Sequence, residues 1–236
     1  LVLILVVDRL FIESNMSDSV PVAAATISMQ SVAVLPFADL SENGDQDWFS
    51  DGLTEEILNS LAQLPELKVT SRTSAFQFKG RDIDISKIAD TLKVANVVEG
   101  SVRRIGDRLR VTAQLIRAAD GFHLWSETYD SNTENLFDVQ SSIAEEIATT
   151  LNIYLDDNRR ESMFATGTRN VEAFQLYLKG METYREAHSS SIIDKLWEAN
   201  AYFDEALAID PGYGIASVIK MDAYAHLLVD PATSTQ

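Results

Sequence analysis

The sequence predicts an α/β (α+β) domain, in which helices pack on a mixed sheet, followed by an all-α segment of helical repeats. The first observation is the stretch from Ala95 to Asp130, which reads as three antiparallel strands joined by the tight turns Gly106-Asp107 and Asp120-Gly121. The second is that amphipathic helical segments flank this stretch. The third is that, beyond Asn170, apolar residues recur only at helical spacing.

The middle strand carries the clearest pattern of the chain. Its residues alternate between an apolar set (Leu109, Val111, Ala113, Leu115) and a largely polar one (Arg110, Thr112, Gln114, Ile116). Successive strand side chains point to opposite faces, so one face is buried and the other is largely polar. A helix cannot use a period of two.

The residues before this meander predict strands alternating with helices. SVAVLPF from Ser31 reads as a buried first strand, and a helix is expected from about Asp47 to Leu64, ended by Pro65. Residues 67–71 read as a second strand. Gly52 inside this helix costs about 1 kcal/mol relative to alanine. A close approach to a neighbouring strand would explain why glycine is tolerated there.

Two further helices complete the expected domain. Asp84 is suited to cap a short one, after an irregular segment or single turn at residues 72–78. Ser131 and Glu134 fit a capping box for another, which would run to about Leu155. The remaining helices are expected beyond residue 170, at Val171–Ala187, Ile192–Ile209 and Tyr213–Leu228, with Trp197 in their core.

The division of the chain follows from these elements. We expect the truncated end of a transmembrane helix at residues 1–12, a linker at 13–30, the α/β domain at 31–156, a second linker at 157–169 and incomplete helical repeats at 170–236. The apolar run from Leu1 to Val7 is too short to cross a bilayer, which needs about 20 residues. It is either a first strand or the end of a membrane helix, and the charged and low-complexity residues after it favour the helix.

Composition restricts the function. A formal net charge of −17 makes nucleic acid a poor partner for this fragment. The chain has no cysteine, which excludes disulfides and thiolate chemistry. The three histidines lie in different elements without metal-ligand spacing, and no phosphate-binding loop or nucleophile elbow occurs. We therefore expect no catalytic, metal or cofactor site. Glu55 and Glu56 resemble a catalytic pair, but adjacent helical residues point in different directions, so we expect both on a solvated helix face.

One polar feature departs from the acidic background. The first hairpin of the meander carries Arg103, Arg104, Arg108 and Arg110. The plain interpretation is solubility and protection of the sheet edge; the functional one is a contact surface for an acidic partner, which could be the acidic helical half of this chain. Trp125 would extend a recognition surface if it is exposed.

Two families are similar to this sequence. The stretches SVAVLPFADLSENGDQDWFSDGLTEEI, SRTSAFQFKG and VVEGSVRRIGDRLRVTAQLIRAADGFHLWSETYD resemble the TolB amino-terminal-like domain of bacterial proteins, from Ser31 to about Leu155. The segment from Ala199 through Phe203 to Pro211 resembles the second helix of a tetratricopeptide repeat, and Tyr213 opens what looks like the next repeat. The first resemblance implies a layout of membrane helix, TolB-like domain and repeats. In proteins with this layout the upstream part is often an adenylate cyclase catalytic domain or a winged-helix DNA-binding domain, and any such domain would precede Leu1.

These observations lead to two hypotheses. The first is a non-catalytic sensor or scaffold module of a membrane-anchored bacterial regulator, extracytoplasmic, that binds a protein or peptide through the α/β domain and the repeat groove. The alternative is a small-molecule-binding sensory domain that regulates the upstream domain, with its ligand near Asp39 to Trp48. A pocket with perturbed titratable groups would instead indicate an enzyme.

Overall fold

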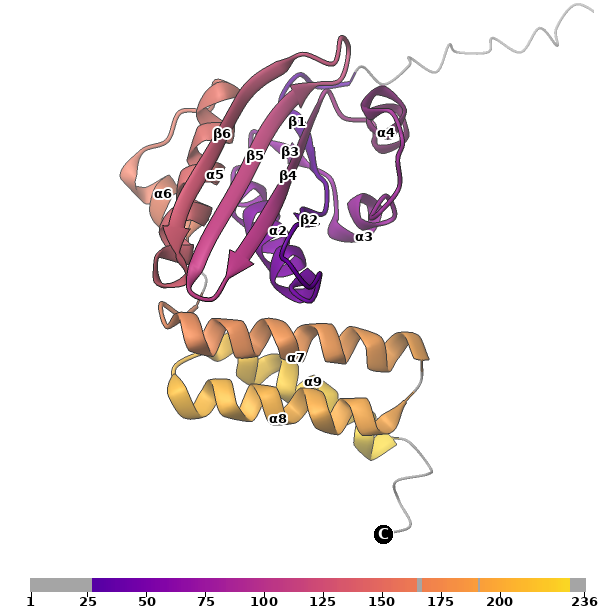
Figure 1. Ribbon diagram of the computed structural model, residues 1–236, viewed down its shortest axis with the longest axis vertical. Coiled ribbons are helices and arrows are strands. Elements are labelled where there is room, and N and C mark those ends of the chain that lie inside the picture. The colour runs from indigo at the N-terminus through magenta and orange to yellow at the C-terminus, as the bar shows by residue number, and fades with distance from the viewer. Residues whose placement is uncertain (1–26, 165–166, 191, 230–236) are drawn as a thin grey trace, which may run out of the picture.

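The structure, a computed structural model, describes residues 27–164, 167–190 and 192–229. An α/β domain lies beside a unit of three long helices (Figure 1). The expected membrane helix at 1–12 and most of the linker at 13–30 fall outside the described residues. Within those ranges no helix is both long and apolar enough to cross a membrane.

A six-stranded mixed sheet forms the centre of the α/β domain. Its order is β3-β1-β4-β5-β6, and β2 also pairs with β4. The first three strands pair in parallel, whereas β4, β5 and β6 are antiparallel to one another. The strands are β1 (Ser31–Val34), β2 (Ala38–Asp39), β3 (Lys68–Val69), β4 (Asn96–Ile105), β5 (Arg108–Arg117) and β6 (His123–Asn132).

The predicted meander is confirmed. β4, β5 and β6 each have ten residues, and the turns between them fall at the predicted glycines. Gly106 and Gly121 have φ of 58° and 73°, the left-handed region that glycine adopts without a steric cost. Leu109, Val111 and Leu115 are at most 1% exposed, so the alternation does separate a buried face from a polar one.

Helices cover the two faces of the sheet unequally. On one face lie α2 (Asp47–Ala62) and α5 (Leu136–Thr150), which enclose the main core. Against β1 and the start of β4 on the other face lie α3 (Arg72–Phe76) and α4 (Ile85–Leu92), over a smaller core. The rest of that second face, on β5 and β6, is polar and exposed, as shown by the Thr112 and Thr128 hydroxyls, 3.1 Å apart. As predicted, Asp84 caps α4, and its Oδ1 accepts a hydrogen bond of 2.8 Å from the Ser86 N–H.

The predicted start and end of the helix after the meander are wrong. Ser131 still belongs to β6, paired with Leu109, and a short 3₁₀ turn, η1 (Thr133–Asn135), precedes α5. Ser131 therefore pairs within the sheet and does not cap the helix as predicted. The helix ends at Thr150 because the chain turns at Asn152, whose φ is 58°, and Tyr154 is left 77% exposed.

The segment expected as a linker at 157–169 contains a helix, α6 (Asp157–Met163). Its cap is Asp156, whose Oδ1 accepts a hydrogen bond of 2.9 Å from the Arg159 N–H, and Met163 is buried in the main core. This helix was not predicted because its composition is polar. Met163 is its one buried residue, and its arginines Arg159 and Arg160 form ion pairs with Glu66 and Glu145.

The remaining helices are α7 (Val171–Ser190), α8 (Ile193–Ile209) and α9 (Gly214–Val229). α7 and α8 approach closely at Gly180, where an added Cβ would lie 2.5 Å from the Phe203 ring. Helix pairing is thus confirmed, whereas the tetratricopeptide assignment stays a prediction. Trp197 was wrongly expected in the core: it is 50% exposed, since Leu196, Ala199 and Phe203 form the buried side of α8.

Candidate functional site

The helical unit joins the α/β domain through contact between α7 and α2. Leu178 of α7 lies directly over Gly52, where an added Cβ would meet its Cδ1 at 2.4 Å. The close approach expected at Gly52 therefore exists, but to a helix and not to a strand. Phe174, Tyr177 and Leu178 belong to the same core cluster as the buried face of the sheet. The two parts of the chain consequently share one hydrophobic core.

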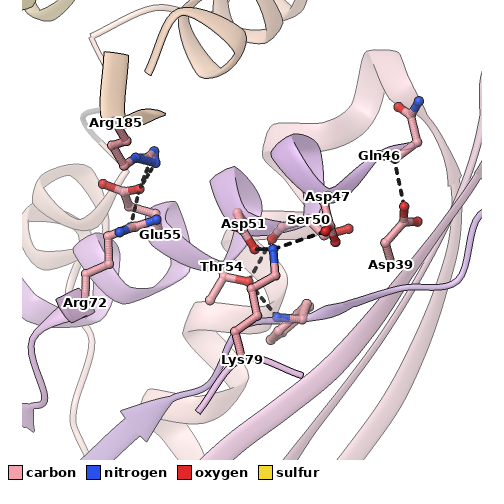
Figure 2. A network of polar contacts seen from close by, with 11 residues as sticks. Asp39, Gln46, Asp47, Ser50, Asp51, Thr54, Glu55, Arg72, Lys79 and Arg185 are labelled. Carbon is pink, nitrogen blue, oxygen red and sulfur yellow. Dashed lines mark hydrogen bonds and ion pairs between the residues drawn. The ribbon is translucent and has the colours of Figure 1, made fainter. Parts of the chain in front are cut away.

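A three-residue ion-pair cluster lies beside this contact. Glu55 Oε2 is 2.9 Å from Arg72 Nε and 3.2 Å from Arg185 Nη2, so one carboxylate links α2 to both α3 and α7 (Figure 2). Burial is the largest influence on Arg185 and lowers the pKa of its guanidinium. The expectation that Glu55 lies on a solvated face is wrong, because α7 covers this side of α2.

A second polar cluster lies one turn earlier on α2. Lys79 Nζ is 2.8 Å from Asp51 Oδ1 and 3.4 Å from Asp47 Oδ2 (Figure 2). Burial raises the pKa of Asp51, and the ammonium of Lys79 opposes that rise. This pair ties the loop after α3 to the start of α2.

The carboxyl group of Glu56 lies in the junction, the contact between α2 and α7, and has a raised pKa. Burial first, and then the neighbouring charge of Glu55, raise the pKa of Glu56 to about 7. The phenol groups of Tyr177 and Tyr213 lie near enough for the charge of Glu56 to raise their pKa values too. The helical unit thus places a carboxyl group in a poorly solvated position, which sequence spacing on α2 alone could not reveal.

A double-mutant cycle tests the contact at Gly52. We expect Gly52→Ala to destabilise the wild-type protein by about 1 kcal/mol, because the new methyl group displaces Leu178. In a Leu178→Ala background the same change should stabilise by about 1 kcal/mol, since alanine favours helix over glycine. Urea unfolding of the four proteins measures both values. An equal effect in the two backgrounds would contradict the contact.

The structure separates the four arginines of the first hairpin. Arg103 pairs opposite Arg110 in the ladder, and Arg108 lies on the same open face. Arg104 points to the other face, where its Cζ is 5.5 Å from the Phe49 ring centre. The charge cluster therefore has three members on one face, because adjacent strand residues alternate in direction.

Trp125 does not join this arginine face. It lies opposite Leu115, on the side of the sheet that faces α5, and it packs half-buried against the main core together with Tyr129. The acidic helical half, one possible partner of the arginines, contacts a different surface: α7 packs on α2 and not on the open arginine face.

The loop from Asp39 to Trp48 does border a hollow. Asp39 organises the loop by accepting hydrogen bonds of 2.8 Å from the N–H groups of Ser41 and Gln46. Burial alone would raise the pKa of Asp39, but these hydrogen bonds together lower it. The hollow has a volume of about 460 Å³, and Arg104 and Lys179 line it from the hairpin and from α7.

The ranges that the structure describes contain no group of three or more histidine, aspartate or glutamate residues suited to hold a metal ion.

The geometry defines a class of protein: a mixed α/β domain with a helical unit fastened to it by a shared core and an ion-pair cluster. More particularly, residues 28–146 match the second domain of HilA/YgeH-like transcriptional regulators, and the chain belongs to that family.

Individual proteins are also similar to this chain. A putative adenylate cyclase 3 of Rhizobium meliloti (strain 1021) is 36% identical over 186 residues, which are 79% of this chain and 31% of that protein. The chain therefore spans about a third of the length of this relative. TolB from Acinetobacter baumannii has a TM-score of 0.37 at 14% identity, over 51% of this chain and 28% of TolB. Lipoprotein GNA1162 from Neisseria meningitidis has a TM-score of 0.39 at 19% identity, over 50% and 96% of the respective chains.

Proposed function

We propose that this chain is a non-catalytic interaction module of a membrane-anchored bacterial regulator. The helical unit binds a protein partner, and the binding alters the contact between the helical unit and the α/β domain. The observation that carries the proposal is an apolar row on α9. Ile215, Val218 and Met221 are 47%, 57% and 64% exposed, at a spacing of three residues on one side of the helix. Exposed apolar patches of this kind are typical of protein interaction sites.

The junction supports a connection between that row and the sheet. α9 packs on α8, α8 packs on α7, and α7 is fastened to α2 through Leu178 and Arg185. In this proposal α9 can take two positions, and they differ in the α7–α2 contact. A partner that binds one position more tightly shifts the equilibrium toward it, by at most the difference between its two binding free energies. In this proposal the membrane tether and the extracytoplasmic location follow from the TolB-like layout, and the output lies in an adenylate cyclase or DNA-binding domain elsewhere in the full protein.

Site-specific photo-crosslinking in cells tests the partner. A photoreactive amino acid at Val218 or Met221 should yield a discrete protein adduct, whereas the same group at the exposed Glu198 of α8 serves as the matched control. The adduct at Val218 should disappear when Ile215 and Met221 are changed to glutamate. Equal adducts at all three positions, or none at Val218 and Met221, would contradict the proposal.

A small-molecule sensory domain is the second candidate. The hollow at the Asp39–Trp48 loop favours it, because both the β4–β5 turn and α7 contribute to the lining. A ligand there would contact the α/β domain and the helical unit at once. Its lining is mainly polar, so a polar ligand would fit it best.

A further inference from the structure

The open arginine face carries a second hollow, to which α2, α7 and α9 contribute no lining residue. This hollow has a volume of about 670 Å³, within the size range of small-ligand sites. It lies where the β4–β5 turn meets the end of β6. Arg103, Arg108, Arg110, Asp130, Ser131 and Asn135 are among its lining residues.

The three arginines differ in how far they are already paired. Arg110 is fully engaged by Asp130, with Nε–Oδ1 and Nη2–Oδ2 distances of 2.6 and 2.8 Å. Arg103 uses only its Nε, which donates to the Leu40 carbonyl at 3.2 Å and leaves the terminal nitrogens available. The Arg108 side chain makes no hydrogen bond or ion pair within the described ranges, and its charge acts only at longer range, where it helps to lower the pKa of Asp130.

This arrangement leaves a local excess of positive charge. Three guanidinium groups face one carboxylate, in a chain that has 36 acidic residues and only 19 basic ones. Arg103 and Arg110 are directly opposite in the ladder, where like charges destabilise a sheet. A bound anion would remove that cost.

The donors available select the kind of anion. Two guanidinium groups with free terminal nitrogens offer more donors than the two oxygens of a carboxylate can accept. A phosphate monoester has three terminal oxygens and a charge of about −1.5 to −2 at pH 7, which matches the unpaired charge of Arg103 and Arg108. We propose that this hollow binds a phosphoryl group, carried by a small phosphorylated molecule or by a phospholipid headgroup.

Titration of the ¹⁵N-labelled protein tests the site. Sodium pyrophosphate and glycerol 1-phosphate, added at constant ionic strength, should shift the backbone amides of residues 103–110 and 130–135 saturably. Changing both Arg103 and Arg108 to glutamine should weaken binding roughly tenfold or more, because charge-assisted hydrogen bonds are lost. The matched control changes both Arg81 and Lys87 to glutamine, which removes two exposed positive charges elsewhere; it should leave the affinity unchanged.

Two further arms separate the sources. Binding to phosphatidylcholine vesicles that contain phosphatidic acid, with little response to glycerol 1-phosphate, would identify a headgroup; tight binding of the soluble ester would identify a small molecule. The proposal is overturned if neither binds saturably, if the double variant binds as well as wild type, or if a glutamate-rich peptide binds the same arginines more tightly. Because no residue of α9 lines the hollow, these results are independent of the crosslinking test.

Discussion

Gly100→Ala is expected to destabilise the protein by about 3 kcal/mol, because the added methyl group has no room between two fixed neighbours. A Cβ at Gly100 would lie 2.4 Å from the Thr112 carbonyl oxygen and 2.7 Å from Phe37 Cε2. The carbonyl belongs to β5, and moving it would break the β4–β5 ladder. Phe37 is 1% exposed, and its N–H donates to Thr54 Oγ1 at 3.0 Å, so it too is held in place.

Urea unfolding followed by circular dichroism measures this effect. Gly214→Ala is the matched control, because a Cβ there meets nothing within 4 Å and its backbone needs no left-handed conformation. The control should be neutral or slightly stabilising, since alanine favours the helix that begins there. A Gly100→Ala protein as stable as the control would show that β4 and β5 are not packed as described.

The second large effect is a pH dependence that originates at Glu56. Its pKa is about 7 in the folded protein, whereas the ordinary value for a glutamate, which applies to the unfolded chain, is 4.5. The folded state therefore binds this proton more tightly than the unfolded state. The contribution of Glu56 to stability is fully favourable below pH 4.5, declines as the pH rises to about 7, and is constant above that.

Glu56→Gln isolates this contribution from other titrating groups. The variant mimics the neutral acid, so its stability relative to wild type should increase by about 2 kcal/mol between pH 5 and pH 8. Glu55, Tyr177 and Tyr213 face the same region and are present in both proteins. The measurement is urea unfolding at both pH values.

Glu42→Gln, in an exposed loop, is the control for a change of one charge. It should show the same difference from wild type at both pH values, to within about 0.5 kcal/mol. If Glu56→Gln behaved as this control does, the carboxyl group of Glu56 would be solvated and the junction would be more open than the structure indicates.

The strands and most helices were predictable because their signals are local. The period of two in β5 and the glycine-aspartate turns specify the meander without reference to any other segment. Asp84 also caps its helix with its own side chain. The predictions that failed depended on distant partners. The capping box at Ser131 is absent because Ser131 pairs with Leu109 in the sheet. The expected linker at 157–169 contains a helix, and its Met163 is buried in the main core.

The candidate sites were less predictable for the same reason. Adjacent arginines in a strand look like one cluster in the sequence, yet alternation places Arg104 on the face opposite Arg103. The pattern around Trp125 is ambiguous, and only its pairing with Leu115 shows which way it points. No local signal could have indicated that Arg185, 130 residues after Glu55, would share its carboxylate with Arg72.

By itself, the sequence determined the mixed α/β class, the order of the main elements and the helical nature of the second half. These properties depend on the spacing of apolar residues and on turn chemistry, which act over a few residues. Only the tertiary structure decided that Glu55 and Glu56 lie under a helical unit, that Gly52 accommodates Leu178, and that three of four arginines border one hollow. The physical reason is that burial and charge pairing depend on which segments meet, and segments far apart in the chain meet only in the folded protein.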